Sequence, residues 1–175
     1  MRKHCMALWA LALVCALPVA AQDNDAYLAG WQADFDRTSQ KLNDLAAAFP
    51  DDMYGWRPAE GVRSVGEVCA HVVQANYALS GILGAESPAD FPQDVEQSVT
   101  GKDDLLMWLE KSQDHARKAG ASTASEDLTE TVDAFGGTWS MYDVLILIGG
   151  HSHEHLGQLI AYARMNGVEP PWSGE

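Results

Sequence analysis

The chain has 175 residues, and its 25 aspartate and glutamate side chains outnumber its 11 lysines and arginines, so its formal net charge at pH 7 is −14. A surface this acidic repels the phosphate groups of nucleic acids and the headgroups of anionic membranes. We therefore expect neither as a partner, and we expect clefts in this surface to attract cations.

The first 21 residues have the three-part pattern of a secretory signal peptide. A short basic start at residues 1–3 precedes an apolar run from Met6 to Ala16, and small residues follow up to Ala21. The apolar run is too short to span a membrane. The pattern predicts cleavage after Ala21, export to the periplasm, and one domain over residues 22–175.

Two of the three cysteines, Cys5 and Cys15, lie within the predicted signal peptide. A lipid anchor on Cys15 is the alternative to simple cleavage, but the large side chains of Leu13 and Val14 disfavour it. Cys69 then remains alone, so we expect no internal disulfide and interpret Cys69 as a small buried thiol.

Residues 25–49 are predicted to form the first long helix, which Pro50 ends. Apolar side chains recur there at steps of three, four and seven residues, which marks one face of a helix. These side chains are Leu28, Trp31, Phe35, Leu42, Leu45 and Phe49.

A second helix is predicted from Ser64 to about Leu83, and Gly84 follows it as a stop. Ser64 and Glu67 have the spacing of a capping box, in which each side chain accepts the backbone N–H of the other residue. An apolar face follows at Val65, Val68, Val72, Ala75, Leu79 and Ile82. Residues 86–97 contain two prolines and are predicted to form a loop.

Two further helices are predicted, over residues 100–120 and 140–166. The connection at 121–139 is polar, with a short extended segment expected at 131–135. Ser140 is the expected N-cap of the last helix. Four amphipathic helices with little strand signal predict an all-α fold, an antiparallel four-helix bundle.

Three histidines lie close together in the last predicted helix. Its apolar face passes from Ile148 through His151 and His155 to Leu159, whereas His153 points to another face. Two imidazoles one turn apart on the same face can chelate one cation. The alternative is a pair of buried histidines that are hydrogen-bonded to their neighbours.

A metal site would need a further ligand from another helix. His71 lies next to the apolar face of the second helix and is the candidate. His115 stands among charged residues, where we expect it to be solvated, and His4 belongs to the signal peptide.

Two catalytic motifs are absent from this region of the sequence. A zincin motif would need a second histidine where Gly157 stands, three residues after Glu154. No Gly-x-Ser-x-Gly sequence frames a nucleophilic serine.

Three segments together resemble the DinB-like (DinB/YfiT) superfamily of metalloenzymes. They are WRPAEGVRSVGEVCAHV at 56–72, GTWS at 137–140 and HSHEHLGQLIAYARMNGVEPP at 151–171. The resemblance covers essentially all of residues 22–175. It implies a four-helix bundle in up-down-down-up order, and many members resemble dimers.

The resemblance also implies a divalent metal on three histidines, which at the matching positions are His71, His151 and His155. Nickel, zinc, iron and manganese all accept three imidazoles, and zinc is our default because exported proteins commonly meet it. The family pattern often has an arginine where this chain has Leu156, which puts in doubt any anion contact by that arginine.

Glu67 precedes His71 by one helical turn, so it could orient His71 or act as a catalytic base. Its role in the capping box is the alternative. Gln158 could line the site or make structural hydrogen bonds. We expect a metal-dependent hydrolase or group-transfer enzyme for a small molecule; a non-catalytic metal-binding or stress and envelope accessory protein is the alternative.

Overall fold

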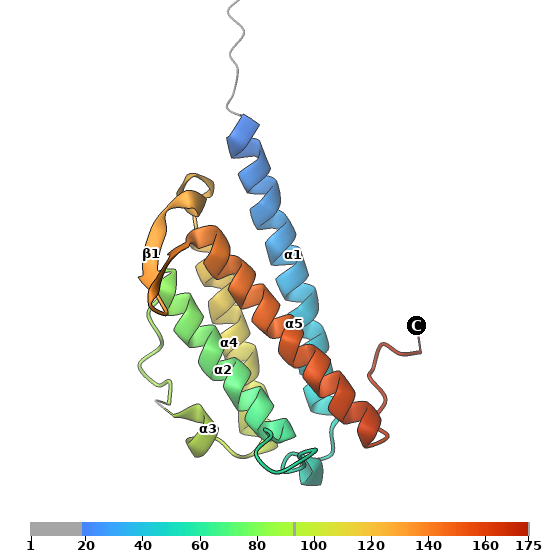
Figure 1. The fold of residues 1–175 in the computed structure, drawn as a ribbon. Coiled ribbons are helices and arrows are strands. Elements are labelled where there is room, and N and C mark those ends of the chain that lie inside the picture. Colours follow the sequence, from blue (N-terminus) through green and yellow to red (C-terminus); the bar gives the residue numbers. More distant parts are fainter. Residues whose placement is uncertain (1–18, 93, 175) are drawn as a thin grey trace, which may run out of the picture.

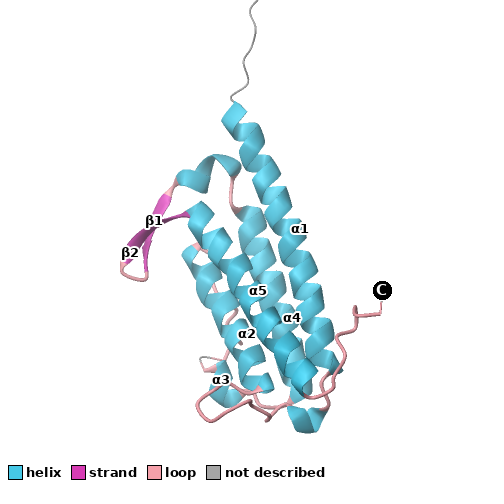
Figure 2. Cartoon of the chain, turned by 45° about the vertical axis from the view of Figure 1, so that its right-hand side comes forward, coloured by secondary structure: helices cyan, strands magenta, loops and turns pink. Residues whose placement is uncertain are grey.

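The computed structural model describes residues 19–92 and 94–174, and of residues 19–22 only the backbone. Most of the predicted signal peptide lies outside the described residues. The protein is predominantly helical, with the four predicted long helices present (Figures 1 and 2). They are α1 (Val19–Ala48), α2 (Val65–Ile82), α4 (Lys102–Ser122) and α5 (Met141–Met165).

The long helices pack side by side. α2 contacts α4 and α5, and α1 contacts the same two helices from the other side. The chain runs down α1 and up α2, crosses back to the lower end, then runs up α4 and down α5 (Figure 1). A continuous apolar core that includes Leu42, Phe49, Val72, Leu109 and Leu159 fills the space between them.

The predicted capping box at Ser64 and the predicted N-cap at Ser140 are both formed. Ser64 Oγ accepts the Glu67 backbone N–H at 3.2 Å, and the Glu67 carboxylate accepts the Ser64 N–H at 2.7 Å. Ser140 and Asp143 make the same pair of bonds at the start of α5. These caps satisfy N–H groups that the first turn leaves unpaired, and so they set where α2 and α5 begin.

Among the described residues, five short elements occupy the connections: two 3₁₀ helices, two strands and a single helical turn. The 3₁₀ helices are η1 (Asp51–Met53) and η2 (Ser125–Thr129). A hairpin of β1 (Thr131–Ala134) and β2 (Gly137–Ser140) pairs Thr131 with Ser140 and Ala134 with Gly137. The expected extended segment at 131–135 is therefore a strand, although its hairpin partner at 137–140 was not predicted.

The prediction of a loop throughout residues 86–97 is wrong at its end. Residues Val95–Ser98 form a single helical turn, α3, in which the Asp94 side chain accepts the backbone N–H of Gln97. A helix of four residues is too short to show an apolar periodicity, so only its cap could have indicated it.

A close approach of α1 to α4 occurs at Trp31. The indole lies directly over Gly120, its Nε1 donates to the Leu145 carbonyl at 2.7 Å, and its ring stacks on Phe35 with centroids 5.2 Å apart. One side chain of α1 thus contacts both α4 and α5, and the contact with α4 requires the absence of a side chain at Gly120.

A buried hydrogen-bond chain links α2 to α4. Asn76 Nδ2 donates to Ser112 Oγ at 3.1 Å, and Ser112 Oγ donates to the Leu109 carbonyl at 2.9 Å. Both side chains are essentially inaccessible to water. An unmade hydrogen bond costs more at such a site than at the surface, because water cannot replace the lost partner.

We therefore expect Asn76→Ala to lower the free energy of unfolding by about 1–3 kcal/mol. Gln40→Ala is the control, since Gln40 donates to Asp44 at the exposed surface and its loss should cost below about 0.5 kcal/mol. Urea denaturation of the two variants measures both values. Equal effects would contradict a structural role for the buried bond.

Among the described helices, none combines the length and the apolar composition that a membrane crossing requires.

Candidate metal centre

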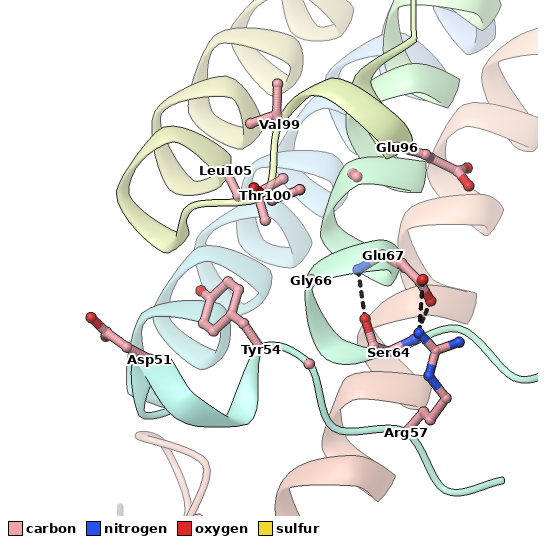
Figure 3. A pocket seen from close by; sticks show the side chains of 12 residues that line it. Asp51, Tyr54, Arg57, Ser64, Gly66, Glu67, Glu96, Val99, Thr100 and Leu105 are labelled. Atoms are coloured by element: carbon pink, nitrogen blue, oxygen red, sulfur yellow. Dashed lines mark hydrogen bonds and ion pairs between the residues drawn. The ribbon is translucent and has the colours of Figure 1, made fainter. Parts of the chain in front are cut away.

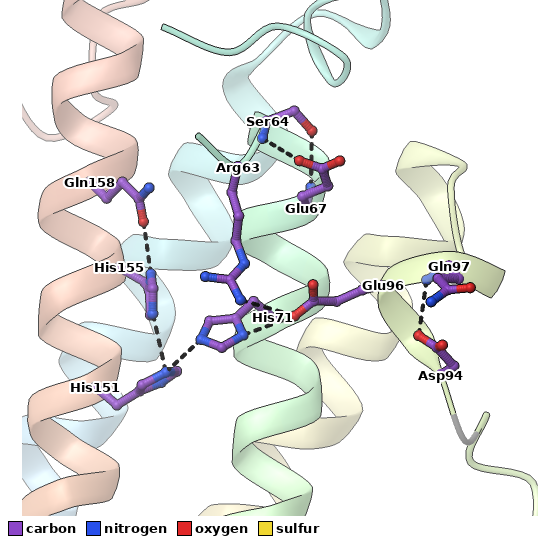
Figure 4. Close-up of polar contacts among 10 residues, drawn as sticks. All are labelled: Arg63, Ser64, Glu67, His71, Asp94, Glu96, Gln97, His151, His155 and Gln158. Atoms are coloured by element: carbon purple, nitrogen blue, oxygen red, sulfur yellow. Dashed lines mark hydrogen bonds and ion pairs between the residues drawn. The ribbon is translucent and has the colours of Figure 1, made fainter. Parts of the chain in front are cut away.

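Three histidines from two helices meet near the middle of α2 and α5 (Figure 4). His151 Nε2 lies 3.2 Å from His71 Nε2 and 3.1 Å from His155 Nε2. His155 is buried, while His71 and His151 are partly accessible. The three side chains are positioned to bind a metal ion. They are the three histidines that the sequence analysis predicted as metal ligands.

Their position follows from helical phase. His151 and His155 are one turn apart on the buried side of α5, between Ile148 and Leu159, which are both fully buried. His71 lies on α2, which packs against α5. The apolar stripes that hold these helices together therefore also bring the imidazoles together.

A chain of hydrogen bonds fixes the tautomer of His155. The Arg63 carbonyl can only accept, so Tyr162 Oη donates to it at 3.0 Å and in turn accepts from Gln158 Nε2 at 2.7 Å. Gln158 Oε1 then faces His155 Nδ1 at 2.9 Å and accepts its proton. His155 Nε2 is left with a free lone pair that faces His151 Nε2 at 3.1 Å.

His71 is held in the same way by a carboxylate. Glu96 Oε1 lies 2.9 Å from His71 Nδ1, and it is also 3.5 Å from a guanidinium nitrogen of Arg63 (Figure 4). Because a carboxylate accepts the Nδ1 proton, His71 Nε2 also presents a lone pair. Carboxylate–histidine pairs of this kind orient metal ligands and raise their basicity.

These tautomers decide whether the residues fit a metal. Lone pairs of His71 and His155 converge on His151 Nε2, whose single proton could satisfy only one of them. A shared cation satisfies all three. A tetrahedral zinc site with Zn–N bonds of about 2.0–2.1 Å places its nitrogens about 3.4 Å apart. The 3.2 and 3.1 Å from His151 Nε2 to the other two Nε2 atoms are close to this value, and all three ligand atoms lie within 4.8 Å of one another.

The surroundings of His151 and His155 favour the neutral form of these two rings. Burial, together with the neighbouring rings of His155 and His71 and the charge of Arg63, lowers the pKa of His151 to about 4. Burial also lowers the pKa of His155, although its bond to Gln158 acts in the opposite direction. Neutral imidazoles are the form that binds metals.

The Glu67 carboxylate does not contact His71, although the sequence suggested that it could orient this histidine. The carboxylate accepts from the Ser64 backbone and from Arg57 at 2.9 Å, and these bonds lower its pKa. Glu96 instead contacts His71. The orienting role therefore belongs to Glu96, and the role of Glu67 as a catalytic base remains a prediction.

Glu67 lines a separate polar pocket of about 340 Å³ beside the start of α2 (Figure 3). Its wall also includes Tyr54, Arg57 and Glu96, but none of the three clustered histidines. Glu96 thus borders both regions, whereas Glu67 belongs only to the polar pocket.

The remaining histidines lie away from the cluster. The side chain of His153 is half exposed, with Nε2 2.7 Å from Asp34 of α1, as expected for a residue on another face. The expectation that His115 is solvated is wrong, because its ring is half-buried 4.8 Å from the ring of Tyr77. This burial lowers the His115 pKa.

Cys69 is a buried thiol, as predicted, and its burial raises its pKa to about 12. A thiol that stays protonated in this way is a poor nucleophile and a poor metal ligand.

Two residues of the site, Glu96 and Arg63, were not predicted from the sequence. Glu96 belongs to the short helix α3, and the Asp94 cap was the only local sign of that helix. Arg63 precedes the Ser64 cap and reaches the cluster from the loop before α2 (Figure 4). Its position depends on the long-range contact of Tyr162 with its carbonyl.

The sequence profile of the DinB superfamily matches residues 34–159, which is most of the chain. The chain belongs to the DinB superfamily. No curated protein matches it in sequence. The matched region of this DinB superfamily member contains all three clustered histidines.

Two crystal structures share the fold of this DinB superfamily protein. A DinB-like protein from Bacillus cereus ATCC 10987 superposes with a TM-score of 0.70 at 19% identity, covering 81% of this chain and 94% of that one. The DinB-like protein YjoA from Bacillus subtilis gives 0.65 at 23% identity, covering 82% and 96%. At these identities the likeness concerns the fold.

Proposed function

We propose that this DinB superfamily protein binds one divalent cation through His71, His151 and His155 and acts as a hydrolase or group-transfer enzyme on a small molecule. The observation that carries the proposal is the convergence of three imidazole Nε2 atoms, two of which have lone pairs fixed by Glu96 and by Gln158. Zinc is the proposed metal, with nickel, iron or manganese as alternatives that the same ligands would accept.

A divalent cation on three neutral imidazoles keeps its full charge, which lowers the pKa of water or of a substrate thiol beside it. The chain's own residues prepare the site for this chemistry. Glu96 retains the Nδ1 proton of His71, Gln158 retains that of His155, and Arg63 adds a positive charge beside Glu96. We therefore propose Glu96 as the main positioning residue.

A non-catalytic metal-binding role is the second candidate. It is supported by the two glutamates considered for roles at the site, which both have other partners: Glu96 is paired with His71 and Arg63, and Glu67 with Ser64 and Arg57. An enzyme of this kind would need an open coordination position, whereas a structural site would be closed by a fourth ligand.

Cobalt substitution tests the choice between the two candidates. Cobalt(II) in place of the native metal reports its coordination through its visible absorption bands. We expect added thiocyanate to change these bands, because three protein ligands leave room for an exogenous anion. An unchanged spectrum at saturating thiocyanate would favour the closed, non-catalytic site.

The role of Glu96 leads to a testable prediction. Glu96→Gln removes the carboxylate from His71 and should weaken zinc binding by about 10–100-fold. Glu67→Gln is the matched control; it should leave zinc affinity unchanged, and glutamine can keep the capping box of α2 because its side-chain oxygen also accepts the Ser64 backbone N–H. Competition with a chromophoric chelator measures the affinities. A larger loss of affinity in Glu67→Gln would reverse the assignment.

We also propose that the four long helices form an antiparallel bundle in the up-down-down-up order that the family resemblance implies. The chain directions visible in Figure 1 support this order. Export to the periplasm with cleavage after Ala21 and assembly as a homodimer complete the proposal. Mass spectrometry of protein from the periplasmic fraction and light scattering of that material measure these two properties.

A further inference from the structure

An apolar pocket of about 510 Å³ adjoins the histidine cluster. Its wall is formed by Ala75 and Leu79 of α2, Leu147 of α5, and Phe135 and Trp139 of the hairpin, and it includes His71 and His151. The described residues that line it include no aspartate, glutamate, lysine or arginine. The chain as a whole has a net charge of −14, so a wall without these charged side chains is unusual for it and favours the binding of uncharged groups.

The hairpin supplies the two aromatic side chains of this wall. Phe135 and Trp139 meet edge to face with ring centroids 5.7 Å apart. The Phe135 side chain is 69% exposed, so most of its apolar surface contacts water in the ligand-free protein. An aromatic pair at the mouth of a pocket is suited to contact an apolar ligand.

The backbone at Phe135 is strained. Its φ is 52°, and the next residue, Gly136, has a φ of 75°. A two-residue hairpin turn with two positive φ angles favours asparagine or glycine, and a bulky residue in the left-handed region costs about 1 kcal/mol or more. The chain thus places a phenyl ring at a position that local structure disfavours and where burial in the folded chain does not compensate for it.

We propose that this pocket binds the apolar body of a small uncharged ligand while a donor atom of that ligand reaches the cation. The inference rests on the proposed function, because His71 and His151 belong both to the pocket wall and to the proposed ligand set. The substrate class is an amphiphile with an aromatic or branched aliphatic body and one metal-binding group, such as a thiol or a hydroxyl.

A small molecule fits this pocket better than a second protein chain. The volume lies within the range of about 300–1,000 Å³ that is typical of small-ligand sites. The walls of the pocket come from two helices and a hairpin, and a small molecule between them can reach the partly accessible histidines. A protein surface would instead cover the exposed ring of Phe135 from outside.

Two hydroxamates that share a head group test the proposal by calorimetry on zinc-loaded protein. We expect 4-phenylbutanohydroxamate to bind at least about tenfold more tightly than acetohydroxamate, because only the former has an apolar body to bury. Trp139→Ala and Phe135→Ala should reduce this ratio severalfold without changing the affinity for acetohydroxamate. Ile146→Ala, an exposed apolar residue of α5 outside the pocket wall, should leave the ratio unchanged.

The outcomes separate the pocket from the metal site. Stoichiometric zinc with equal affinity for the two hydroxamates would overturn the pocket and leave the proposed function intact. Without zinc binding the proposed function fails, and 4-phenylbutan-1-ol then tests the pocket alone: binding that Trp139→Ala weakens supports the apolar site, and its absence overturns it. A dimer that Phe135→Ala dissociates would also overturn the proposal, since a second chain would then cover the pocket.

Discussion

Purified protein is expected to hold close to one divalent ion per chain, and substitution of any one of His71, His151 and His155 by alanine should abolish this stoichiometric binding. The reason is geometric: removing one imidazole leaves two ligands, and two histidines hold a cation far more weakly than three. The loss should exceed the roughly 10–100-fold that removal of an outer hydrogen-bond partner costs. Elemental analysis of the dialysed proteins measures the metal content.

His153→Ala is the control for this prediction, because it removes a histidine from the same turn of α5 without touching the cluster. The side chain of His153 contacts Asp34 and Thr38 of α1, so its loss should leave the metal content unchanged. Full metal in the His71→Ala variant would show that the ligands lie elsewhere and would refute the site.

Thermal unfolding gives a second readout of the same site. A ligand that binds only the folded state stabilises it by about 4 kcal/mol at a free concentration of 1,000 times its Kd. We therefore expect zinc to raise the Tm of the wild type and of His153→Ala, but not that of the three ligand variants. A comparable rise in all five proteins would indicate nonspecific binding to the acidic surface.

The elements that the sequence predicts well are those whose signal is local and repeated. The four long helices are each marked by several turns of apolar periodicity. Two of them are also marked at their start, α2 by a capping box and α5 by the N-cap Ser140, and the structure contains both. The same periodicity separates His153 from His151 and His155, because helical phase requires no knowledge of the tertiary fold.

The parts that the sequence does not predict depend on contacts between distant segments. Glu67 is close to His71 in the sequence, one helical turn before it, whereas Glu96 is 25 residues away in the sequence and contacts His71 in the folded protein. The capping box satisfies Glu67 locally and so removes it from competition for His71. The choice between them therefore depends on how α3 packs on α2, which no local pattern records.

The apolar pocket has the same origin. Phe135 and Trp139 lie in a segment that the sequence predicts to be a polar connection. They form one wall of the pocket only because the hairpin folds against α2 and α5. Local preferences even oppose the conformation of Phe135. Such disagreement between local and tertiary preference is typical of functional sites.

Gly120→Ala is expected to destabilise the protein, although alanine is the better helix former. A Cβ at this position would overlap Cζ3 and Cη2 of Trp31 and lie 3.2 Å from Cε3. The indole cannot move freely, since it donates to the Leu145 carbonyl and stacks on Phe35. Overpacking of about 1–3 kcal/mol and loss of a hydrogen bond worth about 1 kcal/mol oppose a helix gain of about 1 kcal/mol.

The net expectation is a loss of about 1–3 kcal/mol in the free energy of unfolding, measured by urea denaturation. Gly30→Ala is the matched control on α1, where a new Cβ would meet nothing within 4 Å and the helix gain should appear alone. A gain of stability in both variants would contradict the close contact between α1 and α4.

A double-mutant cycle assigns the loss to Trp31 itself. In a Trp31→Ala background the ring is absent, so Gly120→Ala should show only the favourable helix term of about 1 kcal/mol. The change of sign between the two backgrounds is the signature of a steric contact, because a general intolerance of α4 to substitution would persist without the indole. Trp31 also donates a hydrogen bond to α5, which carries His151 and His155 and packs against α2. The cycle therefore tests a contact that holds α1 against α4 and against one of the two helices that carry the histidine cluster.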